Sequence, residues 1–377
     1  MLDSIYDFSA VRSRLRVLGQ YVVDLVHENP AGESLNPPMK HRLVFGASYL
    51  TQRFLAVIAD SAFETSDVEQ AILGKLGVDV RKFKCSNESE VIDVARDADV
   101  ILCDASPITR EVISSLRRAK GIVEYGIGYD NIDADAATEK GIVVCNVPDF
   151  MTSEVADHAV ALILALSRKI HEIIPSTRDG EWNWKKFRPI HALDGKTVGI
   201  IGFGNIGRQV AKRLIAFNME MVAYDPHIPL ETIENLGVEA LGLEQLLMIS
   251  DVVTIHVPLT KETRRLIGEK QLALMKNSAI LVNTSRGGVI DQVALAASLR
   301  NHNIAGAGLD VLAKEPPDLS DPILALDNVI VTPHIGWYSE QSSTRLQELA
   351  SLEAERILTG QTPKHPVNPQ VLVKRRT

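Results

Sequence analysis

Three polar residues in the second half of the sequence could perform acid–base chemistry on an anionic substrate: Arg286, Glu315 and His334. Each follows an apolar run typical of a buried strand, and open α/β sheets bind ligands beyond the carboxyl ends of their strands. A histidine with a carboxylate partner can deliver a proton near neutral pH, and a guanidinium binds carboxylates through paired hydrogen bonds. Taken singly, they could be a solvated charge, a turn residue and a surface histidine. Their shared position after strands indicates a reaction site.

A glycine-rich turn precedes these residues in the chain. Gly202-Phe203-Gly204-Asn205-Ile206-Gly207 follows a β-type run and opens a helical pattern. Its glycines allow a tight turn, an approach of the backbone to a pyrophosphate and close packing of helix on strand. Asp225 ends the next apolar run, 18 residues after Gly207, where a carboxylate can accept the ribose hydroxyls and repel a 2′-phosphate. The turn therefore predicts a dinucleotide site for NAD in preference to NADP, rather than a turn without a ligand.

The combination of these groups narrows the reaction class. Reduction of a 2-oxo acid needs a proton donor for the developing alkoxide, a cation for the carboxylate and carbonyl, and a nicotinamide held beside the substrate. His334, Arg286 and the glycine-rich turn would supply these parts, while Glu315 would hold the imidazole. The residues therefore predict hydride transfer between NADH and a small 2-oxo acid.

The composition argues against several other functions. There are 40 basic and 48 acidic residues, a net charge of -8, which offers no electrostatic basis for binding nucleic acid. Cys85, Cys103 and Cys145 lack CxxC spacing, so we expect buried thiols, a reducing compartment and no metal site. No apolar stretch is long enough to span a bilayer, and the first residues do not resemble a secretory signal. We expect a cytoplasmic protein without membrane contact.

The chain has 377 residues, which favours two domains because single cores stop growing at about 250–300 residues. Short apolar runs alternate with helical segments, a pattern typical of βαβ units and parallel sheets. The expected strands form two series, at 54–60, 78–80, 100–103, 121–123 and 142–144, then at 196–201, 221–224, 252–256, 279–283, 306–311 and 329–332. The predicted fold class is α/β, with two doubly wound parallel-sheet domains: a flavodoxin-like substrate domain and a Rossmann NAD-binding domain.

The expected domains divide the chain as follows. Residues 1–52 are an N-terminal extension, with an amphipathic helix at 8–26 followed by a turn-rich linker. Residues 53–149 form the substrate domain, which 336–377 complete with a last helix from about 340, and residues 150–335 form the NAD-binding domain. We expect ligands in the cleft between the domains, with hinge closure at the two chain crossings.

The order of the motifs resembles that of the D-isomer-specific 2-hydroxyacid dehydrogenase family. The similarity runs from about Arg53 to about Leu372 and comprises Gly126-Ile127-Gly128-Tyr129-Asp130-Asn131-Ile132-Asp133, Cys145-Asn146-Val147-Pro148, Gly202 to Gly207, Asn283 to Gly287, Glu315-Pro316 and Pro333-His334. This resemblance implies an NAD-dependent D-2-hydroxyacid dehydrogenase. It also implies that His334 is the acid/base, Glu315 its carboxylate partner and Arg286 the cation that orients the substrate.

The resemblance implies further binding residues. Backbone N–H groups of Ile127 and Gly128 are expected near the substrate carboxylate, and Asp310 beside the nicotinamide carboxamide. The expected coenzyme contacts are Gly202, Gly204, Asn205, Ile206, Gly207, Asp225, Pro258, Thr284, Asp310 and His334. An apolar helix at 153–167 and an arm containing Trp182 and Trp184 resemble the family's dimer contact, which implies a homodimer.

Within the family, Asp149 and Trp337-Tyr338-Ser339-Glu340-Gln341 are most similar to the branch of the C-terminal binding proteins, corepressors that keep a dehydrogenase site. By this resemblance Trp337 borders the substrate pocket, although it could equally anchor the last helix. Glu124 stands where that branch often has an arginine, and an acid there would disfavour a doubly negative substrate. Two alternatives stay open: an NADH-sensing, corepressor-like binding protein, and hydride transfer from an inorganic substrate such as phosphite.

Overall fold

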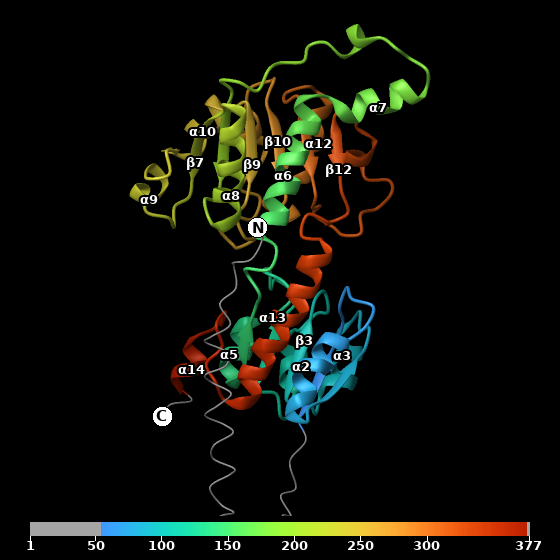
Figure 1. The fold of residues 1–377 in the computed structure, drawn as a ribbon, viewed down its shortest axis with the longest axis vertical. Coiled ribbons are helices and arrows are strands. Elements are labelled where there is room, and N and C mark those ends of the chain that lie inside the picture. Colours follow the sequence, from blue (N-terminus) through green and yellow to red (C-terminus); the bar gives the residue numbers. More distant parts are fainter. Residues whose placement is uncertain (1–53, 375–377) are drawn as a thin grey trace, which may run out of the picture. The chain divides into compact units, whose positions relative to one another are not determined.

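The computed structural model describes residues 54–374 of the chain, in two parallel-sheet α/β domains (Figure 1). The expected N-terminal helix, the linker and the assignment of residues 1–52 as an extension lie outside the described residues. In the part of the chain that is described, no helix has the length and apolar character needed to cross a membrane.

The first domain is built on a sheet of five parallel strands in the order β2-β1-β3-β4-β5, the flavodoxin-like order. Its central strands are buried on both faces, which explains their unbroken apolar sequences. The strands are β1 (Leu55–Ile58), β2 (Asp79–Lys82), β3 (Val100–Cys103), β4 (Gly121–Glu124) and β5 (Val143–Cys145). The register places Leu102 beside Val123 and Cys103 beside Glu124, so β3 and β4 end together at one edge.

Helices cover both faces of this sheet. They are α2 (Asp67–Leu73), α3 (Glu88–Ala95), α4 (Arg110–Ser115), α5 (Ala134–Lys140), α13 (Glu340–Thr359) and α14 (Gln370–Lys374). The long α13 lies against α2, β3 and β4 (Figure 1), so a segment from the end of the chain completes the first domain. Its N-terminus is capped by the Ser339 hydroxyl, and it ends at Gly360, whose left-handed conformation suits glycine.

The outer edge of β5 is covered by the chain that follows α13. The Val144 N–H donates to Oδ1 of Asn368 at 2.8 Å, and the Val367 N–H donates to the Val144 carbonyl at 2.8 Å. The Asn368 amide also donates to the Ile142 carbonyl at 3.0 Å. Asn368 is 2% exposed, so these bonds form a buried seam along the edge strand.

The second domain is built on a sheet of seven parallel strands in the order β12-β11-β10-β9-β6-β7-β8. The chain starts in the middle and winds outward on both sides, which is the Rossmann arrangement. The strands are β6 (Thr197–Ile201), β7 (Glu220–Tyr224), β8 (Glu239–Ala240), β9 (Val252–Ile255), β10 (Ile280–Asn283), β11 (Gly306–Leu309) and β12 (Val329–Val331). The reversal of strand order falls between β6 and β9, where such sheets bind their ligands.

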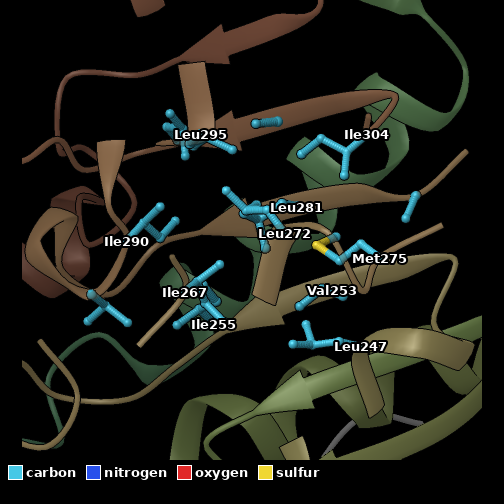
Figure 2. Close-up of a cluster of buried hydrophobic side chains, with 14 of the residues drawn as sticks. Leu247, Val253, Ile255, Ile267, Leu272, Met275, Leu281, Ile290, Leu295 and Ile304 are labelled. Atoms are coloured by element: carbon cyan, nitrogen blue, oxygen red, sulfur yellow. The ribbon is translucent and has the colours of Figure 1, made fainter. Parts of the chain in front are cut away.

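Apolar cores fill both faces of the second sheet. On one face α6 packs against α8, β10 and β11. Figure 2 shows the core of the other face, where Leu281, Leu295 and Ile304 meet around the central strands. The helices are α6 (Thr152–Ser167), α7 (Ile170–Arg178), α8 (Asn205–Leu214), α9 (Leu230–Glu234), α10 (Leu243–Ile249), α11 (Glu269–Leu272) and α12 (Gln292–Arg300).

The predicted strands all occur, and β8 and α7 are among the elements that the sequence analysis did not name. β8 has only two residues and no apolar run, and α7 contains Pro175 in its interior, so neither presented a clear pattern. The chain leaves β5 for α6 and leaves β12 for α13, so it passes twice between the domains. The exact boundaries at 149/150 and 335/336 stay predictions.

Candidate active site

A cavity of about 580 Å³ is lined by residues of both domains. The first domain contributes Asp104, Glu124 and residues 126–128, and the second contributes Arg286, Glu315 and His334. The three residues singled out for acid–base chemistry therefore share one cavity, together with Trp337.

His334 and Glu315 form a short polar contact in this cavity. Nδ1 of His334 lies 2.6 Å from Oε2 of Glu315, while Oε1 of Glu315 accepts the Leu312 N–H at 2.9 Å. Burial alone would raise the pKa of Glu315, but the hydrogen bond and charge of His334, with smaller effects from Leu312 and Arg286, lower it below its usual value. An ionised Glu315 accepts the Nδ1 proton, so Nε2 is left to exchange a proton with a substrate.

The loop that carries His334 is fixed by Asp310. His334 has φ of 52°, a left-handed conformation that is uncommon for residues other than glycine. Its N–H donates to the Asp310 carbonyl at 2.8 Å, and the N–H groups of Ile335 and Gly336 donate to the Asp310 carboxylate, each at 2.9 Å. Thr332 adds a hydroxyl donor at 2.6 Å. The buried carboxylate thus binds the backbone after His334 and the Thr332 side chain before it.

Burial of Asp310 raises its pKa, and the hydrogen bonds of His158, Thr332 and the loop N–H groups lower it further than burial raises it. The carboxylate is 3% exposed and stays ionised because of these donors. These four donors match the roughly four acceptor positions of a carboxylate, and the contact of Asp310 with a nicotinamide carboxamide stays a prediction.

Arg286 lies in a turn organised by Asn283. The Asn283 side chain donates to the Arg286 carbonyl at 3.0 Å and accepts the Ser285 N–H at 3.0 Å, which fixes the backbone after β10. The guanidinium reaches across to the first domain, where its Nε lies 3.5 Å from Oδ1 of Asp130. A Cβ added to Gly128 would lie 1.7 Å from Nη2 of Arg286, so the guanidinium rests directly on this glycine.

The loop after β4 supplies donors beside this guanidinium. The N–H groups of Ile127 and Gly128 donate to no protein acceptor within residues 54–374, although both residues line the cavity. Two unused N–H groups next to a guanidinium suit a carboxylate. Trp337 lines the same cavity and contacts Phe150, with ring centroids 6.1 Å apart.

The glycine-rich turn has the geometry that a dinucleotide requires. Gly202 has φ of 90°, and a Cβ added there would lie 2.6 Å from the His256 carbonyl oxygen. A Cβ on Gly207 would lie 2.2 Å from the Gly202 carbonyl oxygen, whereas a Cβ on Gly204 would meet nothing within 4 Å. The first and third glycines therefore serve packing, and the second faces open space.

The surroundings of the turn fit the phosphates and sugars of a dinucleotide. The first N–H groups of α8, at Asn205, Ile206 and Gly207, have no acceptor inside the helix and point out of its N-terminus. Asp225 accepts the Phe203 N–H at 2.8 Å and the His227 N–H at 2.9 Å, which holds its carboxylate beside the turn. Thr284 is 8% exposed and its buried hydroxyl has no hydrogen-bond partner among the described residues, and its contact with the coenzyme stays a prediction.

The other residues predicted to contact the coenzyme make few hydrogen bonds to the described protein. Pro258 is exposed after β9, and Ile206 is half-buried in the first turn of α8. The Asn205 amide lies 3.4 Å from Oδ1 of Asp149, at the end of the first domain. Among residues 54–374, no group of three or more histidine, cysteine, aspartate or glutamate side chains is placed to hold a metal ion.

Sequence reasoning missed several residues that shape the cavity. Asp104 follows β3 and lies in the lining of the cavity. Asp130 pairs with Arg286, whereas the sequence indicated only that it belongs to a motif. Asn131 donates to the carbonyls of Asp104 and Ser106, each at 3.1 Å, and to Oε2 of Glu124 at 3.2 Å. Their positions after parallel strands were the available signal, since β3 and β4 end at the same edge.

Residues 160–336 match the family model described as "D-isomer specific 2-hydroxyacid dehydrogenase, NAD binding domain". The second domain is therefore an NAD-binding domain of this type. The match contains the glycine-rich turn, Arg286, Glu315 and His334.

Curated relatives extend the match into the first domain. A D-3-phosphoglycerate dehydrogenase of Methanocaldococcus jannaschii is 43% identical over 283 residues, which is 74% of this chain and 54% of the relative. A glyoxylate reductase of Korarchaeum cryptofilum is 40% identical over 286 residues, 75% of this chain and 86% of the relative. The chain thus spans about half the length of the phosphoglycerate dehydrogenase and most of the reductase.

Solved structures agree with this assignment. A D-lactate dehydrogenase from Aquifex aeolicus, complexed with NAD and lactic acid, superposes with a TM-score of 0.77 at 30% identity, covering 83% of this chain and 99% of that one. The relatives described here are named as dehydrogenases and reductases, and no corepressor is among them. The chain belongs to the D-isomer-specific 2-hydroxyacid dehydrogenase family.

Proposed function

We propose that the protein is an oxidoreductase that interconverts a small 2-oxo acid and its D-2-hydroxy acid with NADH and NAD. The observation that carries the proposal is the placement of His334, Glu315 and Arg286 in one cavity, with Nδ1 of His334 2.6 Å from Glu315. Family membership supports the reaction class, and the name glyoxylate reductase of the Korarchaeum relative supports a small 2-oxo acid.

Each group would have a distinct role in the reduction. Arg286 and the N–H groups of Ile127 and Gly128 bind the substrate carboxylate, which sets the carbonyl near His334. A nicotinamide, when bound, supplies the hydride to the carbonyl carbon. Nε2 of the protonated His334 donates its proton to the carbonyl oxygen, and Glu315 stabilises the imidazolium through Nδ1. The neutral imidazole that remains is ready to accept a proton in the reverse direction.

The coenzyme would be held by the glycine-rich turn and the strand ends around it. Its pyrophosphate would meet the N-terminus of α8 at Gly204 and Asn205, and a ribose would meet Asp225. Thr284 offers its unpaired buried hydroxyl, and Asp310 lies behind the His334 loop. A carboxylate at Asp225 repels a 2′-phosphate, so we propose NAD as the preferred coenzyme.

We also propose a homodimer. In the second domain, α7 and the arm after it leave large apolar side chains exposed, with Trp182 92% and Trp184 66% exposed and Ile170 and Ile174 close to half exposed. Large exposed apolar side chains of this kind are typical of interaction surfaces, and a second copy of the chain would cover them. Light scattering during size exclusion checks this: about twice the chain mass is expected, and a monomer that persists at micromolar concentration would contradict it.

A cytoplasmic location is part of the same proposal. The three cysteines are buried, at 7% exposure for Cys85 and 0% for Cys103 and Cys145, which fits small apolar core residues in a reducing compartment. Fractionation of the native host, with an antibody against the chain, would place it.

The proposed reaction is tested by following NADH absorbance with glyoxylate, pyruvate and hydroxypyruvate. The full chain should oxidise NADH with at least one of them, and His334→Ala should lower kcat by several orders of magnitude while the Kd for NADH changes little, since the turn at Gly202 is untouched. His302→Ala is the matched control, because His302 is an exposed histidine outside the cavity. An unchanged rate in His334→Ala would overturn the assigned role. Comparing NADH with NADPH in wild type and Asp225→Ala tests the coenzyme preference.

A further inference from the structure

The cavity carries more acidic than basic side chains. Among the charged residues of its lining, the carboxyl groups are those of Asp104, Glu124, Asp130 and Glu315, and the possible cations are Arg264, Arg286 and His334. Asp130 pairs with Arg286, and Glu315 pairs with His334. Within residues 54–374, Asp104 and Glu124 have no ion pair with Lys, Arg or His, so two carboxyl groups face the cavity without a cation.

Glu124 is a buried acid at the end of β4. It is 2% exposed, and its Oε2 accepts the Asn131 amide at 3.2 Å and lies 3.4 Å from Sγ of Cys103. Its Oε1 accepts no hydrogen bond from the described protein. Burial raises the pKa of Glu124 well above its usual value, and Asp104 and Asp60 act in the same direction. The open Oε1 can therefore form a hydrogen bond with a neutral polar group of a ligand.

Asp104 lies on the adjacent strand end and is the negative member of the pair. Burial and the neighbouring Asp60 raise the pKa of Asp104 to about 6, against the opposing charges of His334 and Arg286. The Asp60 side chain accepts the N–H groups of Asp104, Ala105 and Ser106, at 3.0, 2.7 and 3.1 Å. Asp104 is therefore mostly ionised at pH 7.5, and its field reaches both proposed catalytic groups.

We propose that Asp104 and Glu124 determine substrate specificity at this site. They select 2-oxo acids with one negative charge and a small, neutral, hydrogen-bonding substituent, such as a hydroxymethyl group, and they exclude a substituent that carries a phosphate or a second carboxylate. The proposal rests on the proposed function, since Arg286 must take the first carboxylate. A second anion would then lie beside the ionised Asp104 and the buried Glu124, where Asp104 repels a negative charge and little water is left to solvate it.

The lining contains one cation that could act differently. Arg264 is exposed and has no ion pair with an acid in the described residues, and it lines the cavity from the second domain. If Arg264 received the second anion, a phosphorylated substrate would be preferred, which is the opposite result.

The test compares hydroxypyruvate with 3-phosphohydroxypyruvate, which differ only in the phosphate. With the full chain, NADH and pH 7.5, kcat/KM should favour hydroxypyruvate by at least roughly 100-fold, as expected for a like-charge clash in a desolvated pocket. Asp104→Asn should reduce this ratio by roughly 10-fold or more because it removes the ionised group of the pair. Asp97→Asn, which removes the same charge from an exposed position outside the cavity, should leave the ratio unchanged.

Glu124 is tested with a second substrate pair. Pyruvate lacks the hydroxyl of hydroxypyruvate, so Glu124→Met should lower the preference for hydroxypyruvate over pyruvate by roughly 10-fold or more, and Glu124→Gln, which still donates, should restore it. A restored ratio in the Gln variant distinguishes this role from a general loss of folding. Circular dichroism and NADH binding of both variants provide the check on folding.

The outcomes separate the two proposals. If no 2-oxo acid is reduced at all, the proposed function fails. If hydroxypyruvate is reduced but its phosphorylated form is used as well or better, or if Asp104→Asn moves the ratio no more than Asp97→Asn, the proposed function stands and the role of Asp104 and Glu124 is wrong. Equal ratios in Glu124→Met and Glu124→Gln would remove the hydrogen-bonding role of Glu124.

Discussion

Gly128 should be indispensable for the position of Arg286, and replacing it with alanine tests that idea directly. The new Cβ would lie 1.7 Å from Nη2 of Arg286, whereas ordinary contacts begin at 3.4 Å, so the guanidinium must retreat by about 1.7 Å. The end of an arginine side chain can move, so the fold should survive with little change in stability. The guanidinium, however, would no longer lie where the substrate carboxylate needs it.

The size of the effect follows from that displacement. A misplacement of about 1 Å at a positioning group can reduce a rate by about 100-fold, which is about 2.7 kcal/mol of transition-state stabilisation. We therefore expect Gly128→Ala to lower kcat/KM for the best 2-oxo acid by about 100-fold. The Kd for NADH, measured by fluorescence, should change little because the glycine-rich turn lies elsewhere in the chain.

Gly126→Ala is the matched control on the same loop. A Cβ at Gly126 would meet only Oε1 of Glu124, at 3.8 Å, which is an ordinary contact, so its effect should be much smaller. Neither glycine has the left-handed φ that would strain alanine. Equal losses in the two variants, or full activity in Gly128→Ala, would refute the claim that this glycine sets the position of the guanidinium.

Three further substitutions test the groups around the cavity. Glu315→Gln keeps the shape of the side chain, removes the charge opposite Nδ1 of His334 and can present an N–H₂ group to it. We therefore expect kcat to fall by roughly 100- to 10,000-fold while NADH binding is retained. A fall in kcat of less than threefold would contradict the pairing. Asp310→Asn places an N–H₂ donor against the N–H groups of Ile335 and Gly336. We expect urea unfolding to show a free energy of unfolding about 1–3 kcal/mol lower, together with a lower kcat. A loss of rate without a loss of stability would contradict a positioning role for Asp310. The pKa of Asp104 is raised to about 6, so its ionisation lowers the free energy of unfolding above that pH and has no such effect toward pH 4. Asp104→Asn should therefore raise the free energy of unfolding by up to about 3 kcal/mol at pH 7.5 and leave it unchanged near pH 4. An increase in stability that does not depend on pH would refute this.

Much of the fold could be predicted because its signals are local. The apolar runs gave the strands of both sheets, since strands buried on both faces carry continuous apolar sequences. The glycine-rich turn predicted the first strand and the helix that follows it in the second domain. The short β8 and the proline-containing α7 depend on packing against their neighbours, so their sequences carried no comparable pattern.

The sequence indicated which residues line the candidate site, but it did not indicate the contacts between them. His334, Glu315 and Arg286 could be chosen because each follows a strand, yet the left-handed φ of His334 and its support by Asp310 depend on β11 and β12 ending side by side. The contact of Arg286 with Gly128 crosses from one domain to the other. The sequence did not single out Asp104, because a carboxylate after a strand is common and only the fold shows that it lies near His334 and Arg286.

The covered edge of β5 affects how the chain behaves in a crowded solution. An edge strand with open N–H and carbonyl groups is a template for pairing with another molecule, which is how aggregates and strand-exchanged oligomers begin. Val144 offers its backbone groups to Asn368 and Val367 of its own chain, and both Val143 and Cys145 are fully buried. The segment after α13 therefore occupies the edge of β5 and prevents it from pairing with a strand of another molecule. We expect this segment to reduce aggregation as well as to stabilise the fold.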